Sequence, residues 1–192
     1  MTVNEKTRIK IVGIPGSLRE GSHTRQAVEA ALRGAATEGA EVELIDLKKL
    51  DLPLVETVLP DAQAPAEVLA LRKALRKADG IILGTPEYHG SVSGALINAL
   101  DWVGKDEFDG KAVGLVGVSG GAMGANDALN TLRLIGRNLH AWVVPEQASV
   151  PEAWRVLPAA AGAMKERLEG VGRATARIAK LVRAAAGEGV VN

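Results

Sequence analysis

A loop near the start of the chain carries side chains that suit phosphate binding. It occupies residues 16–22, reads GSLREGS, and is followed two positions later by a threonine. The groups that could donate hydrogen bonds to a phosphate belong to Ser17, Arg19, Ser22 and Thr24. A guanidinium can bind two phosphate oxygens at once through charge-assisted hydrogen bonds, which are about twice as strong as neutral ones. The loop therefore predicts a phosphate site, with an ordinary strand-to-helix turn capped by Ser22 as the simpler alternative.

A second loop, residues 85–93, places flat and polar side chains after another apolar run. It reads TPEYHGSVS and contains the only tyrosine of the chain. Flat side chains beside the ligand-binding edge of a sheet can line a planar heterocycle. Tyr88 and His89 supply such flat faces, Pro86 fixes a backbone angle, and Glu87 is the acidic member of the loop. The alternatives are that Tyr88 folds back onto the core, that Glu87 is a solvated charge and that His89 is simply exposed.

A third loop, residues 119–124, reads SGGAMG and follows the apolar run KAVGLVGV. Glycines let the backbone approach a ligand more closely than any side chain would allow. Backbone N–H groups of this loop could therefore donate to the polar edge of a ring. A glycine-rich turn that only serves packing is the alternative.

These loops can meet only if the strands before them are parallel neighbours. Apolar, β-branched runs alternate with amphipathic ones, which is typical of an α/β protein with a parallel sheet. The predicted strands are residues 8–14, 41–46, 80–84, 112–118 and 140–144, the last with an optional continuation at 147–150. The predicted helices are residues 23–38, 64–77, 92–103, 126–138 and about 159–185. Residues 47–60, which contain two prolines, are predicted to be a loop.

This pattern predicts a single domain, residues 1–186, followed by a frayed tail at 187–192. The fold would be a doubly wound five-stranded parallel sheet with helices on both faces. Such sheets bind ligands beyond the carboxyl ends of their strands, where the strand order reverses. The three polar loops all follow strands, so they would lie at that edge.

Composition narrows the classes of partner. The 192 residues include 23 Lys plus Arg, 23 Asp plus Glu and no Cys. Thiol chemistry is excluded, and a neutral chain has no overall field to attract nucleic acid or an anionic membrane. No apolar run reaches the ~18 residues that a membrane span needs, and the N-terminal residues MTVNEKTR are not followed by the apolar region typical of a signal peptide. We therefore expect a cytoplasmic protein that acts on small molecules, not on nucleic acid or at a membrane.

Three segments together resemble the signature segments of the NADPH-dependent FMN reductases. They are GSLREGS at 16–22, PEYHGSVSGALINALDW at 86–102 and GVSGGAMG at 117–124. That family has a flavodoxin-like fold and includes quinone, azo-compound and chromate reductases. The resemblance extends over about residues 10–149, with the segments in the same order and at similar spacing.

The resemblance implies which residues would hold FMN. The phosphate would be bound by Ser17, Arg19, Ser22 and Thr24. The isoalloxazine would be lined by Pro86, Glu87, Tyr88 and His89, and its pyrimidine side would be bound by Ser119, Gly120 and Gly121. The family commonly has Asn at the positions of Thr24 and His89, so one phosphate donor and one ring-edge donor differ here.

The activity that the resemblance implies is that of an FMN-dependent NAD(P)H oxidoreductase. Hydride would pass from NADPH or NADH through flavin N5 to a quinone, an azo compound, free flavin or an oxidised metal ion. No residue of the chain is assigned a catalytic role and no metal is expected, because the flavin carries the chemistry. The family generally forms homodimers or homotetramers through helices beside the flavin, and Trp102 could contribute to such a contact.

Two alternatives belong to other classes of protein. A non-enzymatic FMN-binding electron carrier or sensor would share this fold, but small flavodoxin carriers are usually strongly acidic and this chain is neutral. A nicotinamide-dependent dehydrogenase would place an acidic residue near Asp46, at the end of the second strand. The glycine pattern GxGxxG of that class is absent, so Asp46 is better explained as a strand-end residue or a helix cap.

Overall fold

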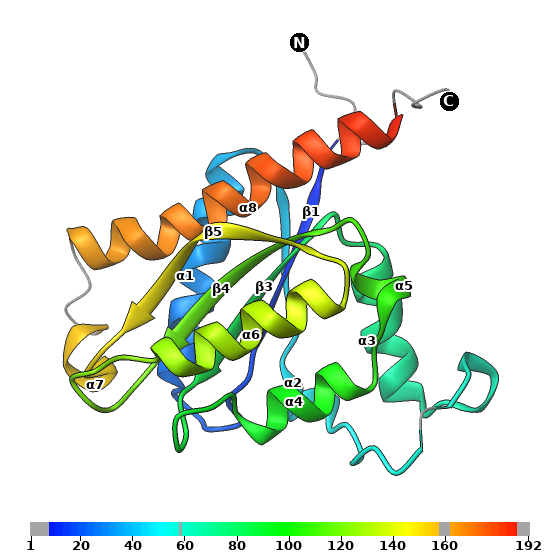
Figure 1. Cartoon of the computed structure of the whole chain (residues 1–192), viewed down its shortest axis with the longest axis horizontal. Helices are drawn as coiled ribbons and strands as arrows, with labels where there is room; N and C mark the ends of the chain where they lie inside the picture. Colours follow the sequence, from blue (N-terminus) through cyan, green and yellow to red (C-terminus); the bar gives the residue numbers. More distant parts are fainter. Residues whose placement is uncertain (1–7, 58, 158–161, 188–192) are drawn as a thin grey trace.

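Five parallel strands form one sheet in the order β2-β1-β3-β4-β5 (Figure 1). The computed structural model describes residues 8–57, 59–157 and 162–187. The strands are β1 (Lys10–Pro15), β2 (Glu41–Leu44), β3 (Gly80–Pro86), β4 (Ala112–Val118) and β5 (Trp142–Val150). The strand order reverses between β1 and β3, so the sheet is doubly wound and flavodoxin-like as predicted.

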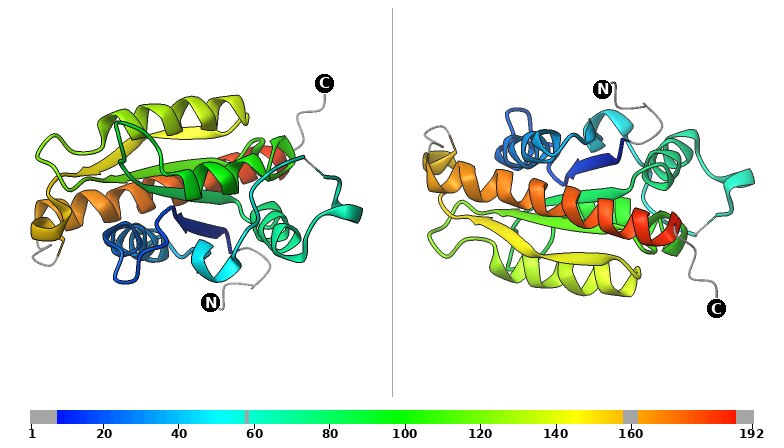
Figure 2. Two further views of the ribbon diagram at one scale, coloured as in Figure 1. Left: turned by 90° about the horizontal axis from the view of Figure 1, so that it is seen from below. Right: turned by 90° about the horizontal axis from the view of Figure 1, so that it is seen from above.

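Helices cover both faces of the sheet (Figure 2). The longer ones are α1 (His23–Thr37), α3 (Ala66–Arg76), α4 (Gly94–Asp101), α6 (Asn126–Asn138) and α8 (Ala163–Gly187). Helices α1 and α8 pack on one face, and the side chains of α3, α4 and α6 join the core of the other. The central strands β3 and β4 are buried along their whole length, which explains their nearly continuous apolar sequences.

Short helices occur where the sequence predicted none. They are α2 (Leu47–Leu50), η2 (Asp61–Gln63), α5 (Lys105–Phe108) and α7 (Ala153–Val156). The prediction that residues 47–60 are a loop is wrong for α2. The Asp46 carboxylate accepts a hydrogen bond from the Lys48 N–H at 3.0 Å and caps this helix, and Leu47 is buried. Asp46 is therefore a helix cap, as expected.

Strand β3 extends further than predicted, and β5 includes the continuation that the sequence left optional. Strand β3 continues to Pro86, so Thr85 and Pro86 belong to the strand rather than to the loop after it. Strand β5 includes the optional continuation, and its pairing with β4 shifts register opposite Gly114, so that Val113 pairs with Val143 but Leu115 pairs with Gln147.

The ends of the chain fall partly outside the described residues. Helix α8 begins at Ala163 and ends at Gly187, whereas residues 158–161, where the sequence places its start, are not described. Most of the predicted tail, residues 188–192, is likewise outside the described residues. The extent of the domain, residues 1–186, stays a prediction.

Candidate functional site

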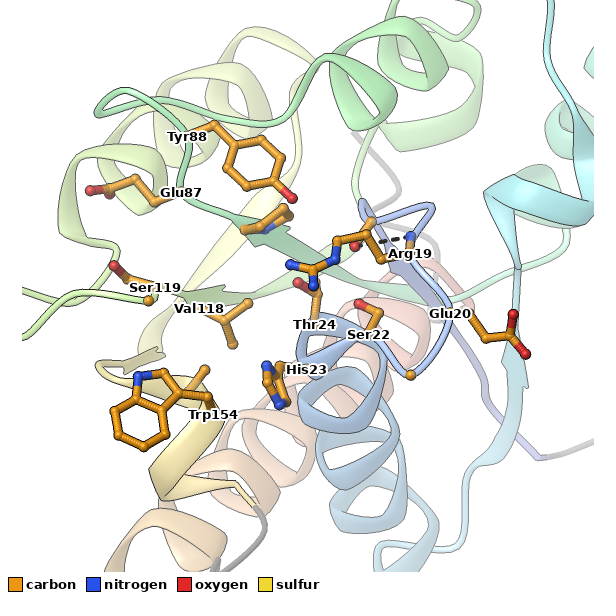
Figure 3. Close-up of a pocket in the computed structure, with 15 residues that line it drawn as sticks. Arg19, Glu20, Ser22, His23, Thr24, Glu87, Tyr88, Val118, Ser119 and Trp154 are labelled. Carbon is orange, nitrogen blue, oxygen red and sulfur yellow. Dashed lines mark hydrogen bonds between the residues drawn. The ribbon is translucent and has the colours of Figure 1, made fainter.

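The three polar loops converge at the carboxyl ends of β1, β3 and β4, where they enclose a cavity of about 240 Å³ (Figure 3). Parallel neighbouring strands end at one edge of a sheet, so loops far apart in the sequence meet there. The predicted residues that line the cavity are Ser17, Arg19, Ser22, Thr24, Pro86, Glu87, Tyr88, Ser119 and Gly120. His89 and Gly121 are not among its lining residues.

The first loop is anchored tightly to the core before it reaches the cavity. The Gly16 N–H donates to the Gly84 carbonyl at 2.7 Å, and the Gly16 carbonyl accepts a hydrogen bond from the Ser93 hydroxyl at 2.5 Å. A Cβ atom at Gly16 would lie 2.7 Å from the Leu96 Cβ, which is closer than packed atoms can approach. Only glycine fits this position. The close packing and the two hydrogen bonds fix the start of the loop at the carboxyl ends of the strands.

Serine 22 is both a helix cap and a cavity residue. Its hydroxyl accepts a hydrogen bond from the Arg25 N–H at 3.3 Å, which caps α1. The simpler interpretation, a strand-to-helix turn capped by Ser22, is therefore correct for this residue. It does not replace the phosphate hypothesis, because the hydroxyl of Thr24 and the guanidinium of Arg19 bond to no other residue that the structure describes, and both residues line the cavity.

The second loop is a tight hairpin that presents Tyr88 to the cavity. Tyr88 and Ser91 exchange two backbone hydrogen bonds of 3.0–3.1 Å. The two residues between them, His89 and Gly90, both have positive φ, at 53° and 72°. This is the backbone of a two-residue hairpin turn that matches the twist of the strands. The Tyr88 side chain is 47% exposed, so it does not fold back onto the core.

His89 is exposed, which was the simpler alternative for it, and Glu87 has a role that the sequence did not predict. His89 is at the apex of the hairpin, away from the lining of the cavity, because the turn needs a residue that tolerates positive φ. The Glu87 carboxylate accepts a hydrogen bond from the Ala128 N–H at 3.0 Å, in the first turn of α6. The carboxylate therefore caps a helix, and Figure 3 shows it directed away from Tyr88 and Arg19.

The third loop offers two backbone donors fewer than predicted. The Gly121 N–H already donates to the Ser119 hydroxyl at 3.0 Å, and the Ser119 N–H donates to the Val150 carbonyl at 2.9 Å. The Gly120 N–H bonds to no other residue that the structure describes and faces the cavity region. Of the three predicted backbone donors, Gly120 is thus the one that remains available to a ligand.

Sequence reasoning missed a fourth segment of the cavity. Ala153 and Trp154 in α7 line it, together with His23 at the start of α1. Strand β5 ends at the same edge of the sheet as β4, so the residues after Val150 belong there too. That position follows from the strand order, and could have been expected once the fifth strand was extended to Val150.

The residues present fit the phosphate of a nucleotide better than they fit a metal ion. The groups at the first loop include hydroxyls, a guanidinium and the N-terminus of α1, which favour an anion, and the Glu20 carboxylate of the same loop is directed away from Arg19 (Figure 3). Within residues 8–57, 59–157 and 162–187, no group of three or more His, Asp and Glu side chains could hold a metal ion. In the same residues, no helix is long and apolar enough to cross a membrane.

Comparison with known proteins decides the family. A sequence model described as "NADPH-dependent FMN reductase" matches residues 9–155. The chain belongs to this family. An NAD(P)H-dependent FMN reductase of Pseudomonas aeruginosa is 35% identical over 143 residues, which are 72% of this chain and 76% of the relative. An FMN-dependent NADPH-azoreductase of Staphylococcus saprophyticus is 40% identical over 140 residues, which are 70% of this chain and 72% of the relative.

Solved structures agree with the fold. A flavoenzyme NAD(P)H:(acceptor) oxidoreductase of Paracoccus denitrificans has a TM-score of 0.70 and 25% identity, over 90% of this chain and 98% of that chain. A flavodoxin of Streptococcus pneumoniae has a TM-score of 0.59 and 15% identity, over 88% of this chain and 97% of that chain. The second likeness shows the flavodoxin-like fold alone.

As a member of the NADPH-dependent FMN reductases, the protein is an enzyme, a flavoprotein oxidoreductase that uses FMN and NAD(P)H. This rules against the electron carrier and the dehydrogenase with a GxGxxG loop as its class. The family model ends at residue 155 and so includes the part of α7 that lines the cavity.

Proposed function

We propose that the cavity formed by the three loops and α7 is the FMN site, at which the enzyme reduces small, flat, conjugated acceptors, namely quinones and azo compounds. The observation that carries this proposal is the meeting of unpartnered phosphate donors with an exposed tyrosine in one cavity at the switch point of the sheet. When bound, FMN supplies the redox centre that accepts hydride from NAD(P)H and returns electrons to the acceptor.

The chain's own residues would position the cofactor. The Arg19 guanidinium and the hydroxyls of Ser17 and Thr24 would bind the phosphate above the N-terminus of α1. Tyr88 and the Gly120 N–H would flank the ring, and a backbone N–H at the pyrimidine edge stabilises negative charge when the ring is reduced. No proton donor of the chain is needed for this role, because the flavin carries the redox chemistry.

The names of two relatives support azo compounds as acceptors, and the shared planar chemistry of quinones extends the proposal to them. Two kinds of relative are named as an NADPH-azoreductase and as an NAD(P)H:(acceptor) oxidoreductase. A quinone takes up two electrons and two protons, and cleavage of an azo bond to two amines takes four of each. Both classes are planar and conjugated, so both can stack beside a flat ring in an open cavity.

The absorbance spectrum of the purified protein tests this proposal. We expect a band near about 450 nm from bound FMN, rapid bleaching after NADPH is added without oxygen, and recovery when a quinone is added. NADH in a parallel sample would establish the preferred donor. Protein that takes up no FMN, or holoprotein that neither nucleotide bleaches, would contradict the proposal.

We also propose that the enzyme works as a homodimer or homotetramer. Tyr88 and Met123 expose large apolar side chains beside the cavity, as such surfaces do where a second subunit packs. Trp102, which the sequence suggested for this contact, is buried at 3% exposure, and its indole N–H donates to the Pro53 carbonyl at 2.8 Å. Light scattering coupled to size-exclusion chromatography tests the assembly, and a monomer would contradict it.

A further inference from the structure

Trp154 is a large apolar side chain that the fold leaves open to water at the rim of the cavity. Its side chain is 60% exposed, although the segment that carries it is well anchored. An exposed indole forgoes the free energy that burial of its apolar area would provide, about 25 cal/mol per Å². Because Trp154 lines a ligand cavity, a bound ligand could bury this exposed area.

The backbone around Trp154 is fixed to the loop that faces the cavity. The Glu152 N–H donates to the Gly121 carbonyl at 3.0 Å, and the Ala153 N–H donates to the Ser119 carbonyl at 2.9 Å. Ala153 is buried in the core beneath α1 and α8. These contacts join α7 to the third loop, so the backbone that carries the indole is held in position without a ligand.

The turn that places Trp154 carries backbone strain. Glu152 has a φ of 42°, in the left-handed region that costs a residue with a side chain roughly 1–2 kcal/mol. An ion pair between Glu152 and Arg155 and the two hydrogen bonds to the third loop hold the turn in this conformation. Strain of this kind is found where an element must present a side chain to a site.

Trp154 and Tyr88 lie on different sides of the cavity. In Figure 3 the indole is on the opposite side of Val118 and Ser119 from the Tyr88 ring, and His23 lies between the indole and the first loop. Arg19 and Ser22 are grouped at the other end, where the phosphate would bind. The end that holds Trp154 is thus the end at which the planar part of a nucleotide would be located.

We propose that Trp154 is a positioning residue of the FMN site, whose indole is covered by the ring system of the bound flavin beside Ser119 and Gly120. This inference rests on the proposed function, because it takes the cavity to be the FMN site. The indole supplies a preformed apolar face, so flavin binding buries area that the apoprotein exposes.

The chain provides its own controls for a test of this contact. Trp142 is 62% exposed, close to the value for Trp154. It is the first residue of β5 and therefore lies at the amino ends of the strands, whereas the cavity lies at their carboxyl ends. Trp102 is buried and should react slowly under all conditions. Oxidation of tryptophan by N-bromosuccinimide in the dark, followed by peptide mass spectrometry, reports on all three side chains in one sample.

We expect saturating FMN to slow the oxidation of Trp154 at least fivefold relative to Trp142, with no change at Trp142. Equal oxidation of Trp154 with and without FMN would overturn the inference, as would a Trp154 that is unreactive before FMN is added, since a partner subunit would then cover it. Protection that requires NADP⁺ in addition to FMN would also overturn it, by assigning the indole to the co-substrate.

Variants test whether the contact contributes to affinity. Trp154→Ala should raise the dissociation constant for FMN about tenfold, which corresponds to ~1.4 kcal/mol, and Trp154→Phe should recover most of that loss. Trp142→Ala should bind FMN as the unaltered protein does. Unchanged affinity in Trp154→Ala would overturn the inference while leaving the proposed function intact, whereas unaltered protein that fails to bind FMN would overturn both.

Discussion

The Ser93 hydroxyl donates a hydrogen bond to the Gly16 carbonyl at 2.5 Å and so joins the start of α4 to the loop after β1. The same hydroxyl accepts from the Leu96 N–H at 3.4 Å as the N-cap of α4, and the Ser93 N–H donates to the Thr85 hydroxyl at 3.1 Å. One buried serine thereby connects the proposed phosphate loop with the loop that carries Tyr88. The geometry of the whole cavity depends on this connection.

Replacement of Ser93 by Ala should affect both stability and binding. It removes a helix cap and leaves the Gly16 carbonyl without this partner, which together cost about 1–3 kcal/mol of unfolding free energy. We expect weaker FMN binding as well, because the first loop loses its tie to α4. Urea denaturation of the apoprotein and FMN titration measure the two effects. Ser91→Ala, at an exposed neighbour, is the control, and equal behaviour of the two variants would contradict the prediction.

Replacement of Arg19 by Ala should lower FMN affinity without unfolding the protein. The guanidinium is exposed and bonds to no other residue that the structure describes, so its loss leaves no buried group unpaired. A charge-assisted hydrogen bond contributes about 1.5–3 kcal/mol, or roughly 10- to 150-fold in the dissociation constant. Arg137→Ala at the far end of α6 is a charge-matched control. Titration of both apoproteins with FMN measures the two dissociation constants. Unchanged affinity in Arg19→Ala would count against the phosphate site.

The Glu87 carboxylate should matter more for stability than for the cofactor. Glu87→Ala removes the hydrogen bond to the Ala128 N–H and a negative charge from the N-terminus of α6, which should cost ~1 kcal/mol. Glu87→Gln keeps an acceptor and should lose less. Thermal unfolding of the two variants gives the comparison. A drop in FMN affinity as large as that of Arg19→Ala, without loss of stability, would instead place this side chain at the ring.

The stability of variants at position 89 should depend on how well the new residue tolerates the positive φ of the hairpin turn. Asn tolerates positive φ as well as His does, so His89→Asn should leave stability nearly unchanged. Val is β-branched and should destabilise the protein by about 1–2 kcal/mol. Chemical denaturation of both variants tests this order. If Val is tolerated and Asn is not, the role of His89 lies in its side chain and not in the turn.

Asp46 should make the stability of the protein depend on pH at the acid end. Burial alone would raise the pKa of Asp46, but hydrogen bonds from Arg25 and from the Lys48 N–H outweigh it and hold this pKa below its ordinary value of 3.8. A carboxyl group with a depressed pKa stabilises the folded state above its unfolded pKa and loses that effect as pH falls through its folded pKa. The difference in unfolding free energy between the unaltered protein and Asp46→Asn should therefore be constant above about pH 5 and shrink below about pH 4. A difference that grows on acidification would contradict this assignment.

The parallel sheet could be predicted from the sequence because its strands are short apolar runs separated by amphipathic helices. Strands β3 and β4 are buried on both faces, so their composition alone distinguishes them from helices. Helix α2 could not be found in this way. Four residues carry no periodic pattern, and the helix exists because Leu47 is buried and Asp46 caps it.

The candidate site was predictable where a residue's role depends on its own loop, and not where it depends on a distant element. The donors of the first loop are close in sequence and meet the cavity as expected. Glu87 is different, since its carboxylate is taken up by a helix that begins 39 positions later, at Asn126. Trp154 was missed because Pro145 and Glu146 interrupt the apolar run of β5, so the strand beyond them was left optional and no cavity segment was assigned after Val150.

The register shift between β4 and β5 affects whether another chain can add a strand to this edge of the sheet. Strand β5 is the outermost strand, and the shifted stretch opposite Gly114 includes Pro145, which has no N–H to donate. An incoming chain that added itself as a sixth strand would find a break in the ladder at this point, and such breaks protect sheet edges from aggregation. In the proposed oligomer, contacts between subunits would therefore be made by side chains of helices and loops and not by this strand edge.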